Sequence, residues 1–98
     1  MRGFQVAPAE IEAVLHADAR VRDCAVFGVP DPDLGEAIVA AVVVVDGETV
    51  TAEELQESVA SQLAGYKRVR HVEFVDEIPR LPSGKALRRT LKEQWLAR

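Results

Sequence analysis

Cysteine, aromatic residues and long apolar runs are all scarce in this 98-residue sequence. The single cysteine, Cys24, excludes a disulfide framework within the chain. The longest apolar run, 37–45, has nine residues, fewer than half of the ~20 that a membrane-spanning helix needs. The sequence therefore predicts a domain with no membrane span. Because no apolar signal region follows Met1, we expect a cytoplasmic location.

The chain length also limits the function. A domain of this size buries roughly 60 to 65% of the surface that its unfolded chain exposes. That is enough for one hydrophobic core but leaves little room for an enclosed active site. We therefore expect residues 1–98 to form one domain, and not a complete multi-substrate enzyme.

Cys24 lies in the apolar stretch CAVF, and neither His16 nor His71 is placed beside it by the sequence. A catalytic thiol needs a cationic or histidine neighbour that stabilises the thiolate. We therefore expect Cys24 to be a small buried hydrophobic residue.

The formal net charge of −4 hides an uneven distribution along the chain. Residues 1–65 carry three basic and twelve acidic groups, a charge of −9, whereas residues 66–98 carry nine basic and four acidic groups, a charge of +5. A basic C-terminal third suggests contact with a phosphate, a nucleotide or an acidic partner. The alternative is a solvated helix face carrying Arg88, Arg89 and Lys92. Nucleic acid is disfavoured because the tail has few aromatic residues on which bases could stack.

The apolar pattern predicts three helices and three strands. The helices are expected over 8–16, from a capping box at Thr51 and Glu54 to near Gly65, and over a final stripe of Leu87, Leu91 and Trp95. Strands are expected over 21–29, 36–45 and about 70–76, and the continuous Ala, Val and Ile content of 36–45 indicates a strand covered on both faces. The predicted fold is α+β: a small three-stranded sheet with about three helices packed on it, plus a short extended segment at 3–6.

The loop 79–85, PRLPSGK, is the segment most suited to chemistry. Its two prolines and its glycine restrict the backbone and hold Lys85 just before a helix. The loop is not a phosphate-binding P-loop, because Pro79 replaces the first glycine of that motif and Ala86 replaces its serine or threonine. A lysine on a stiff turn suits a developing phosphate or carboxylate charge. An ordinary exposed turn lysine is the alternative. We expect no metal site.

Four motifs follow one another along nearly the whole chain: GFQVAPAEIE at 3–12, GVPD at 28–31 with GE at 35–36, GYK at 65–67, and PRLPSGK at 79–85 with LRR at 87–89. Together they resemble the C-terminal domain of the adenylate-forming superfamily, which includes acyl-CoA synthetases, 4-coumarate-CoA ligases and luciferases. The resemblance implies an AMP-forming acid-thiol ligase that uses ATP with Mg2+ and coenzyme A as substrates. A carboxylic acid first forms an acyl-adenylate, and the coenzyme A thiol then displaces AMP.

The resemblance also assigns roles to residues. It implies that Lys85 bridges the carboxylate and the α-phosphate during adenylation, and that this lysine is a site of reversible acetylation. After a large domain rotation, Gly3 and Gln5 would line the approach of the thiol. Separately, the uneven charge suggests that Lys67, Arg68 and Arg70 meet the phosphates of coenzyme A.

In the family, most substrate contacts belong to a large N-terminal domain that this chain lacks. We therefore expect the chain to be a detached or truncated C-terminal domain, which in the family acts as a mobile lid over the active site. We expect this domain to be inactive alone and to have no tightly bound cofactor. Two alternatives stay open. One is a free-standing α+β binding or regulatory module, and the other is the lid of a carrier-protein-loading adenylation domain.

Overall fold

The computed structural model describes residues 8–33, 35–63 and 68–97. This part of the chain forms helices and strands in the order α1 (Pro8–His16), β1 (Val21–Asp31), β2 (Gly35–Val44), α2 (Ala52–Gln62), β3 (His71–Phe74) and α3 (Arg88–Leu96). The predicted α+β class, with a three-stranded sheet and three helices, is confirmed. The expected extended segment at 3–6 lies outside the described residues.

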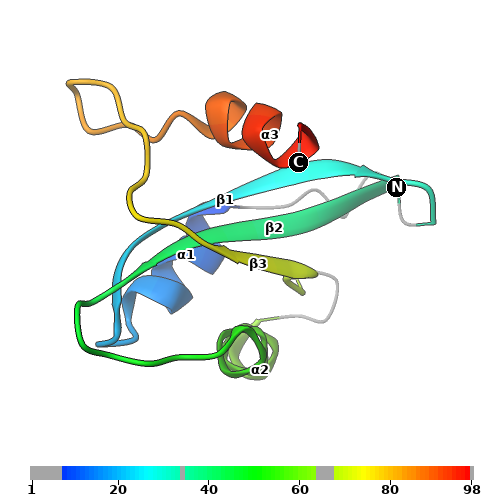
Figure 1. The fold of residues 1–98 in the computed structure, drawn as a ribbon. Helices are drawn as coiled ribbons and strands as arrows, with labels where there is room; N and C mark the ends of the chain where they lie inside the picture. Colours follow the sequence, from blue (N-terminus) through cyan, green and yellow to red (C-terminus); the bar gives the residue numbers. More distant parts are fainter. Residues whose placement is uncertain (1–7, 34, 64–67, 98) are drawn as a thin grey trace.

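The sheet has the strand order β1-β2-β3, with β2 in the centre (Figure 1). Strands β1 and β2 form an antiparallel hairpin in which Val26 lies opposite Ala40. Strand β3 runs parallel to β2, with Ala40 opposite Val72. Parallel neighbours need a long crossover connection, and α2 lies within that connection.

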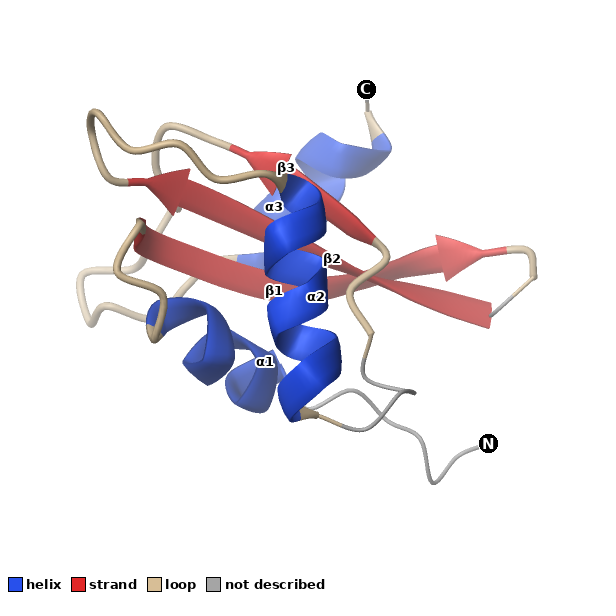
Figure 2. Ribbon diagram, turned by 90° about the horizontal axis from the view of Figure 1, so that it is seen from below, coloured by secondary structure: helices blue, strands red, loops and turns tan. Residues whose placement is uncertain are grey.

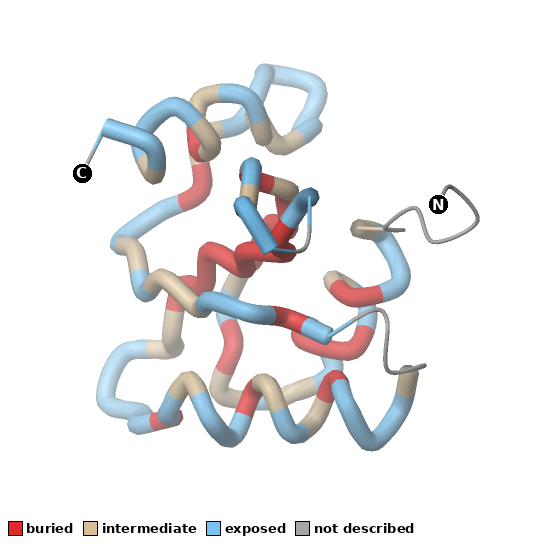
Figure 3. The backbone as a smooth tube through the Cα atoms, turned by 90° about the vertical axis from the view of Figure 1, so that its right-hand side faces the viewer, coloured by how far each residue is buried: buried red, intermediate tan, exposed pale blue. Residues whose placement is uncertain are grey.

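The helices cover both faces of the sheet. Helices α1 and α2 lie on one face and α3 on the other (Figures 1 and 2). Val26, Ala40 and Val42 belong to the cluster on the α1 and α2 side, whereas Val39 and Ala41 belong to the α3 side. Seven consecutive residues of β2 are buried as a result, which confirms the prediction from its continuous apolar content. The buried positions accordingly gather in the interior of the molecule, between exposed outer segments (Figure 3).

The helix and strand ends match the sequence pattern closely. The capping box at α2 is present: the Thr51 side chain accepts from the Glu54 N–H at 3.1 Å, and Glu54 accepts from the Thr51 N–H at 3.0 Å. The helix ends at Gln62, before the Gly65 end that we expected. Strand β3 is shorter than 70–76, although backbone hydrogen bonds to β2 begin at Arg70 and extend to Val75. Within the described residues, no helix is long and apolar enough to cross a bilayer.

Strand β1 is an edge strand, and side chains from both ends of the chain cover its open edge. The Val26 N–H donates to Glu12 Oε2 at 2.8 Å, and the Val26 carbonyl accepts from Arg88 Nε at 2.9 Å. The Arg88 guanidinium also donates to Glu12 Oε1 and Oε2 at 2.9 and 2.8 Å. We call this arrangement of Glu12, Arg88 and Val26 the edge clasp. It joins α1 to α3 and prevents β1 from pairing with another strand.

The edge clasp corrects one expectation from the sequence. Arg88 does not belong to a solvated helix face with Arg89 and Lys92, because its side chain is only about one-third exposed and its Nε and Nη2 atoms bind the Val26 carbonyl and the Glu12 carboxylate. The Arg89 side chain, in contrast, is 91% exposed. The helical period predicts that the two side chains point in directions about 100° apart, but it does not indicate that Arg88 pairs with Glu12, 76 residues earlier in the chain.

The edge clasp leads to a stability prediction. Arg88→Met keeps the aliphatic length but leaves the Glu12 carboxylate without its cation, so the free energy of unfolding should fall by ~1–3 kcal/mol. Urea titration followed by Trp95 fluorescence measures this loss. Arg89→Met is the matched control and should unfold like the parent. Equal urea midpoints for the two variants would contradict a stabilising role of the edge clasp.

Candidate functional site

The loop before α3 is a β-hairpin that carries Lys85. The Leu87 N–H donates to the Pro79 carbonyl and the Leu81 N–H to the Lys85 carbonyl, both at 2.9 Å. At the tip, the Gly84 N–H donates to the Leu81 carbonyl at 2.8 Å. We call residues 79–87 the lysine hairpin. It is the stiff turn that the sequence predicted.

The residue types of the lysine hairpin explain its shape. Pro82 is the second residue of the Leu81–Gly84 turn, where its fixed φ angle is favourable. Gly84 has a φ of +95°, in the left-handed region that glycine enters without strain. A tight turn followed by a glycine in this region is a common hairpin connection. Lys85 therefore follows a position where the backbone conformation demands glycine.

Lys85 itself is exposed, and its ammonium group makes no hydrogen bond or ion pair with any residue that the structure describes. Its backbone is held on both sides: its carbonyl accepts from Leu81 and its N–H donates to Ser83 Oγ at 3.4 Å. The structure thus presents a cation with a free head group on a fixed backbone. Such a group is available to an anion that arrives from another domain or from solvent.

The base of the lysine hairpin is attached to β1 by an ion pair that the sequence analysis missed. Arg80 donates from Nε to Asp23 Oδ2 at 3.1 Å and from Nη2 to Asp23 Oδ1 at 2.5 Å. Its third contact, from Nη1, is to the Gly84 carbonyl at 2.6 Å. The only signal in the sequence was an acidic residue inside an apolar strand, beside a cysteine. Nothing in the spacing linked it to an arginine 57 positions later.

Asp23 is also bound to its own strand. Its Oδ1 accepts from the Cys24 N–H at 2.9 Å, and the β1–β2 register shifts between Val21 and Asp23. Burial alone would raise the pKa of Asp23. The hydrogen bonds from Arg80 and Cys24 and the charges of Arg80 and His16 outweigh this, so the pKa lies below its ordinary value.

Cys24 has no place in a catalytic site. The side chain is buried, its Sγ lies 3.7 Å from the Glu12 carbonyl, and burial together with the charges of Glu12 and Asp23 raises the thiol pKa to about 12. At neutral pH the thiol is therefore protonated and a poor nucleophile. The prediction that it is a buried hydrophobic residue is confirmed.

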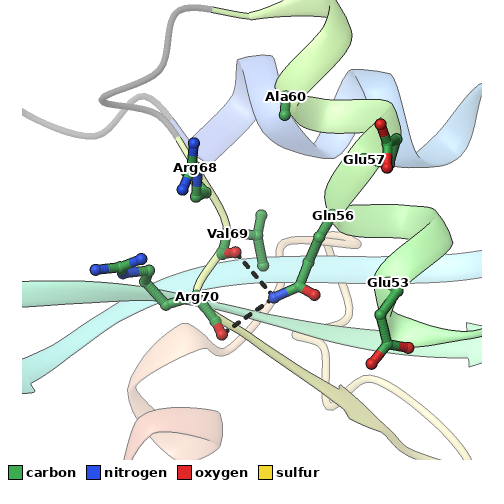
Figure 4. A pocket seen from close by; sticks show the side chains of 7 residues that line it. All are labelled: Glu53, Gln56, Glu57, Ala60, Arg68, Val69 and Arg70. Carbon is green, nitrogen blue, oxygen red and sulfur yellow. Dashed lines mark hydrogen bonds between the residues drawn. The ribbon is translucent and has the colours of Figure 1, made fainter.

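Arg68 and Arg70, which we call the arginine pair, are two of the three basic residues predicted to bind phosphates, and they lie just before the start of β3. Arg68 and Arg70 are exposed, and neither guanidinium has a hydrogen-bonding or ionic partner among the described residues. With α2 they line a pocket of about 420 Å³ (Figure 4). Both side chains extend away from Glu53 and Glu57, which line the opposite side of the pocket (Figure 4).

Gln56 of α2 fixes the backbone of this segment. Its side-chain amide donates to the carbonyls of Val69 and Arg70, both at 3.1 Å (Figure 4). The buried Val69 side chain anchors the segment to the core. The structure therefore brings Arg68 and Arg70 together.

Arg68 and Arg70 do not lie beside Lys85. They precede the start of β3, whereas the lysine hairpin follows its end, so the two groups are at opposite ends of this strand (Figure 1). Gly3, Gln5 and Lys67, the other predicted site residues, lie outside the described residues.

The uneven charge of the chain is now explained in part. Two arginines of the basic third, Arg80 and Arg88, are paired with Asp23 and Glu12 of the acidic part. Arg68, Arg70 and Lys85 have no such partner in the described ranges. Of the predicted site residues that the structure describes, the free cations therefore lie at the two ends of β3, while Arg22 and Lys92 also have no partner in the described ranges.

The fold and the site define a class of protein: an α+β domain with helices on both faces of its sheet, which presents a lysine with no partner among the described residues on a hairpin attached to β1. Comparison with known proteins identifies this class. Residues 10–85 match the family described as AMP-binding enzyme C-terminal domain. The chain belongs to this family.

Curated relatives match over nearly the whole chain. It is 52% identical to 4-coumarate--CoA ligase-like 9 of Oryza sativa subsp. japonica, covering 99% of this chain and 18% of the relative. It is 45% identical to 4-coumarate--CoA ligase 2 of Nicotiana tabacum, over 98% of the chain and 18% of the relative. The chain thus spans about a fifth of the length of these relatives.

Solved structures share the fold. The amide bond synthetase McbA of Marinactinospora thermotolerans superposes with a TM-score of 0.87 at 42% identity, over 92% of this chain and 18% of that one. A fatty acyl CoA synthetase of Mycobacterium tuberculosis has a TM-score of 0.86 at 41% identity, over 94% and 18%. ATP-bound MatB of Rhodopseudomonas palustris has a TM-score of 0.89 at 38% identity, over 95% and 18%.

Proposed function

We propose that this chain is the C-terminal mobile domain of an ATP-dependent, AMP-forming acyl-CoA synthetase. One observation carries the proposal: a chain that aligns over 99% of its length with a 4-coumarate-CoA ligase-like protein presents Lys85, which has no partner among the described residues, on a hairpin attached to the sheet. The same alignment favours this function over a free-standing binding or regulatory module.

In the first half-reaction, Lys85 serves adenylation. A carboxylate oxygen of the acid attacks the α-phosphorus of ATP, the bond from that phosphorus to the β-phosphate oxygen breaks, and pyrophosphate leaves. Two anions approach each other in this step, so a cation placed between them lowers the barrier. The free ammonium group of Lys85 has the charge and the exposure for this role.

In the second half-reaction, the thiol of coenzyme A loses its proton and its sulfur attacks the acyl carbon. The bond from that carbon to the oxygen that bridges it to phosphorus breaks, and AMP leaves with this oxygen. We assign the phosphates of coenzyme A to Arg68 and Arg70, with Lys67, because arginine forks match phosphate oxygens. Gly3 and Gln5 are proposed to line the path of the thiol. The separation of Arg68 and Arg70 from Lys85 along β3 is consistent with a domain that presents different ends in the two steps.

The substrates are proposed to bind mainly to an N-terminal domain. The described ranges contain no cluster of three or more His, Cys, Asp or Glu side chains that could hold a metal ion, so Mg2+ is assigned to ATP in that other domain. We accordingly expect the isolated chain to catalyse neither half-reaction. The proposed location is the cytoplasm.

The acceptor in the second step has one alternative with support. An amide bond synthetase shares this fold at 42% identity, so an amine could replace the coenzyme A thiol. Adenylation by way of Lys85 would be the same in both. The lid of a carrier-protein-loading domain has no such relative among those compared above.

The role of Lys85 is tested in the full-length enzyme that contains this chain. Lys85→Ala should lower the rate of pyrophosphate release from ATP and the acid by about 10²–10³-fold, the effect of removing one well-placed charge donor. Thioester formation from preformed acyl-adenylate should change much less. Undiminished pyrophosphate release would show that Lys85 is not the adenylation lysine.

The role of the arginine pair is tested with the double variant Arg68→Glu and Arg70→Glu. Reversing both charges should raise the KM for coenzyme A by roughly 10- to 100-fold, since each lost phosphate contact weakens binding by about 1.4 kcal/mol or less. The KM for ATP should not change. If the arginines bind the 3′-phosphate of coenzyme A, the KM for dephospho-coenzyme A, which lacks this phosphate, should rise less than the KM for coenzyme A. An unchanged KM for coenzyme A would refute the assignment.

Lys85 is also proposed as an acetylation site, since its exposed ammonium group is accessible to a modifying enzyme. Acetylation removes the positive charge and should abolish adenylation while sparing thioester formation. Mass spectrometry after incubation with a lysine acetyltransferase and acetyl-CoA should find the acetyl group on Lys85. Modification of other lysines only, with no loss of adenylation, would contradict this prediction.

A further inference from the structure

The Arg80 side chain connects β1 to the tip of the lysine hairpin. Two of its nitrogens bind the Asp23 carboxylate on β1, and the third binds the Gly84 carbonyl within the lysine hairpin. The Gly84 carbonyl belongs to the peptide group that contains the Lys85 nitrogen. The Arg80 guanidinium therefore holds the Gly84–Lys85 peptide group in place.

Ala86 packs the base of the lysine hairpin against the core cluster on the α3 side, but the other hydrogen bonds of the hairpin do not fix the direction of its tip relative to the sheet. The hydrogen bonds from Leu81 to Lys85, from Gly84 to Leu81 and from Leu87 to Pro79 all lie within the hairpin. They set its shape, but they would survive a tilt of the whole hairpin about its base. The Arg80–Asp23 ion pair connects it to β1, 57 residues earlier in the chain.

Asp23 is itself a fixed anchor. Its side chain is about three-quarters buried, and Oδ1 also accepts from the Cys24 N–H of the same strand. A planar guanidinium can bind both carboxylate oxygens and a carbonyl at once, because its five N–H donors point in fixed directions. A lysine at this position would offer a single nitrogen for all three acceptors.

We propose that Arg80, held by Asp23, is a positioning residue for Lys85: it fixes the direction of the lysine hairpin so that the ammonium group reaches the reacting phosphate. This inference rests on the proposed adenylation role of Lys85. Arg80 acts through the Gly84 peptide and does not touch the substrates. Displacement of a catalytic group by about 1 Å can cost on the order of 100-fold in rate, so loss of the ion pair should be visible in the kinetics.

The kinetic test uses the full-length enzyme with Arg80→Ala, Arg80→Lys and Asp23→Asn. Arg80→Ala should lower kcat for pyrophosphate release by about 10- to 100-fold, with the KM for ATP within about twofold and thioester formation from preformed acyl-adenylate preserved. Arg80→Lys keeps a charge opposite Asp23 and should recover part of the loss. Arg22→Ala, an exposed arginine on the same strand as Asp23, is the matched control and should behave like the parent.

A double-mutant cycle separates positioning from direct contact. If Arg80 acts only through Lys85, Arg80→Ala should cause no further loss of pyrophosphate release in a Lys85→Ala background. Additive losses would overturn the inference, because they would mean that Arg80 meets the substrate or stabilises the fold generally. If Lys85→Ala alone leaves adenylation intact, the proposed function fails first, independently of Arg80.

A second measurement needs no activity. In the 98-residue chain, backbone 15N relaxation of Lys85 should give an order parameter near the ~0.85 of rigid backbone, falling below ~0.6 with Arg80→Ala or Asp23→Asn. The order parameters of β2 should not change, and this result would show that each variant is folded. A rigid Lys85 in both variants would overturn the proposal.

Discussion

The open edge of β1 is the constraint on which the rest of this domain depends. A strand with unpaired N–H and carbonyl groups must bind something, or it will pair with another chain. Here the outward N–H groups of Cys24 and Val26 are bound by the carboxylates of Asp23 and Glu12. Each carboxylate then holds an arginine from the C-terminal third. Closure of the sheet edge and attachment of the last third of the chain are thus the same set of interactions.

This arrangement separates two groups of described basic residues in the C-terminal third, which have different tasks. Arg80 and Arg88 stabilise the fold through their ion pairs with Asp23 and Glu12. Lys85, Arg68 and Arg70 have charge available, and the sheet holds them at opposite ends of β3. A small rigid domain can therefore offer a single lysine at one end and a pair of arginines at the other, with no conformational change of its own.

The sequence predicted the elements well because their signals are local. The capping box at Thr51 and Glu54, the apolar content of β2 and the restrictive residues around Lys85 all lie within a few positions of the feature they specify. The pairing of Asp23 with Arg80 and of Glu12 with Arg88 could not be predicted, because each joins residues far apart in the chain. The charge count showed an excess of basic groups in residues 66–98, but it could not show which of these groups form ion pairs. The roles of Gly3, Gln5 and Lys67 stay predictions, as these residues lie outside the described ranges.

The distance along the chain between the two halves of the edge clasp has a consequence for synthesis. The β1–β2 hairpin is local and can form early, whereas Arg88 follows Glu12 by 76 residues. During translation, Glu12 and Asp23 can bind the outer N–H groups of β1 early, but the arginines that hold these carboxylates and the Val26 carbonyl arrive only when almost all of the described chain has left the ribosome. In that interval the hairpin exposes unpaired backbone groups and the apolar face that α3 will cover. Aggregation through the edge of β1 is therefore prevented only when α3, the last helix of the described chain, has been made.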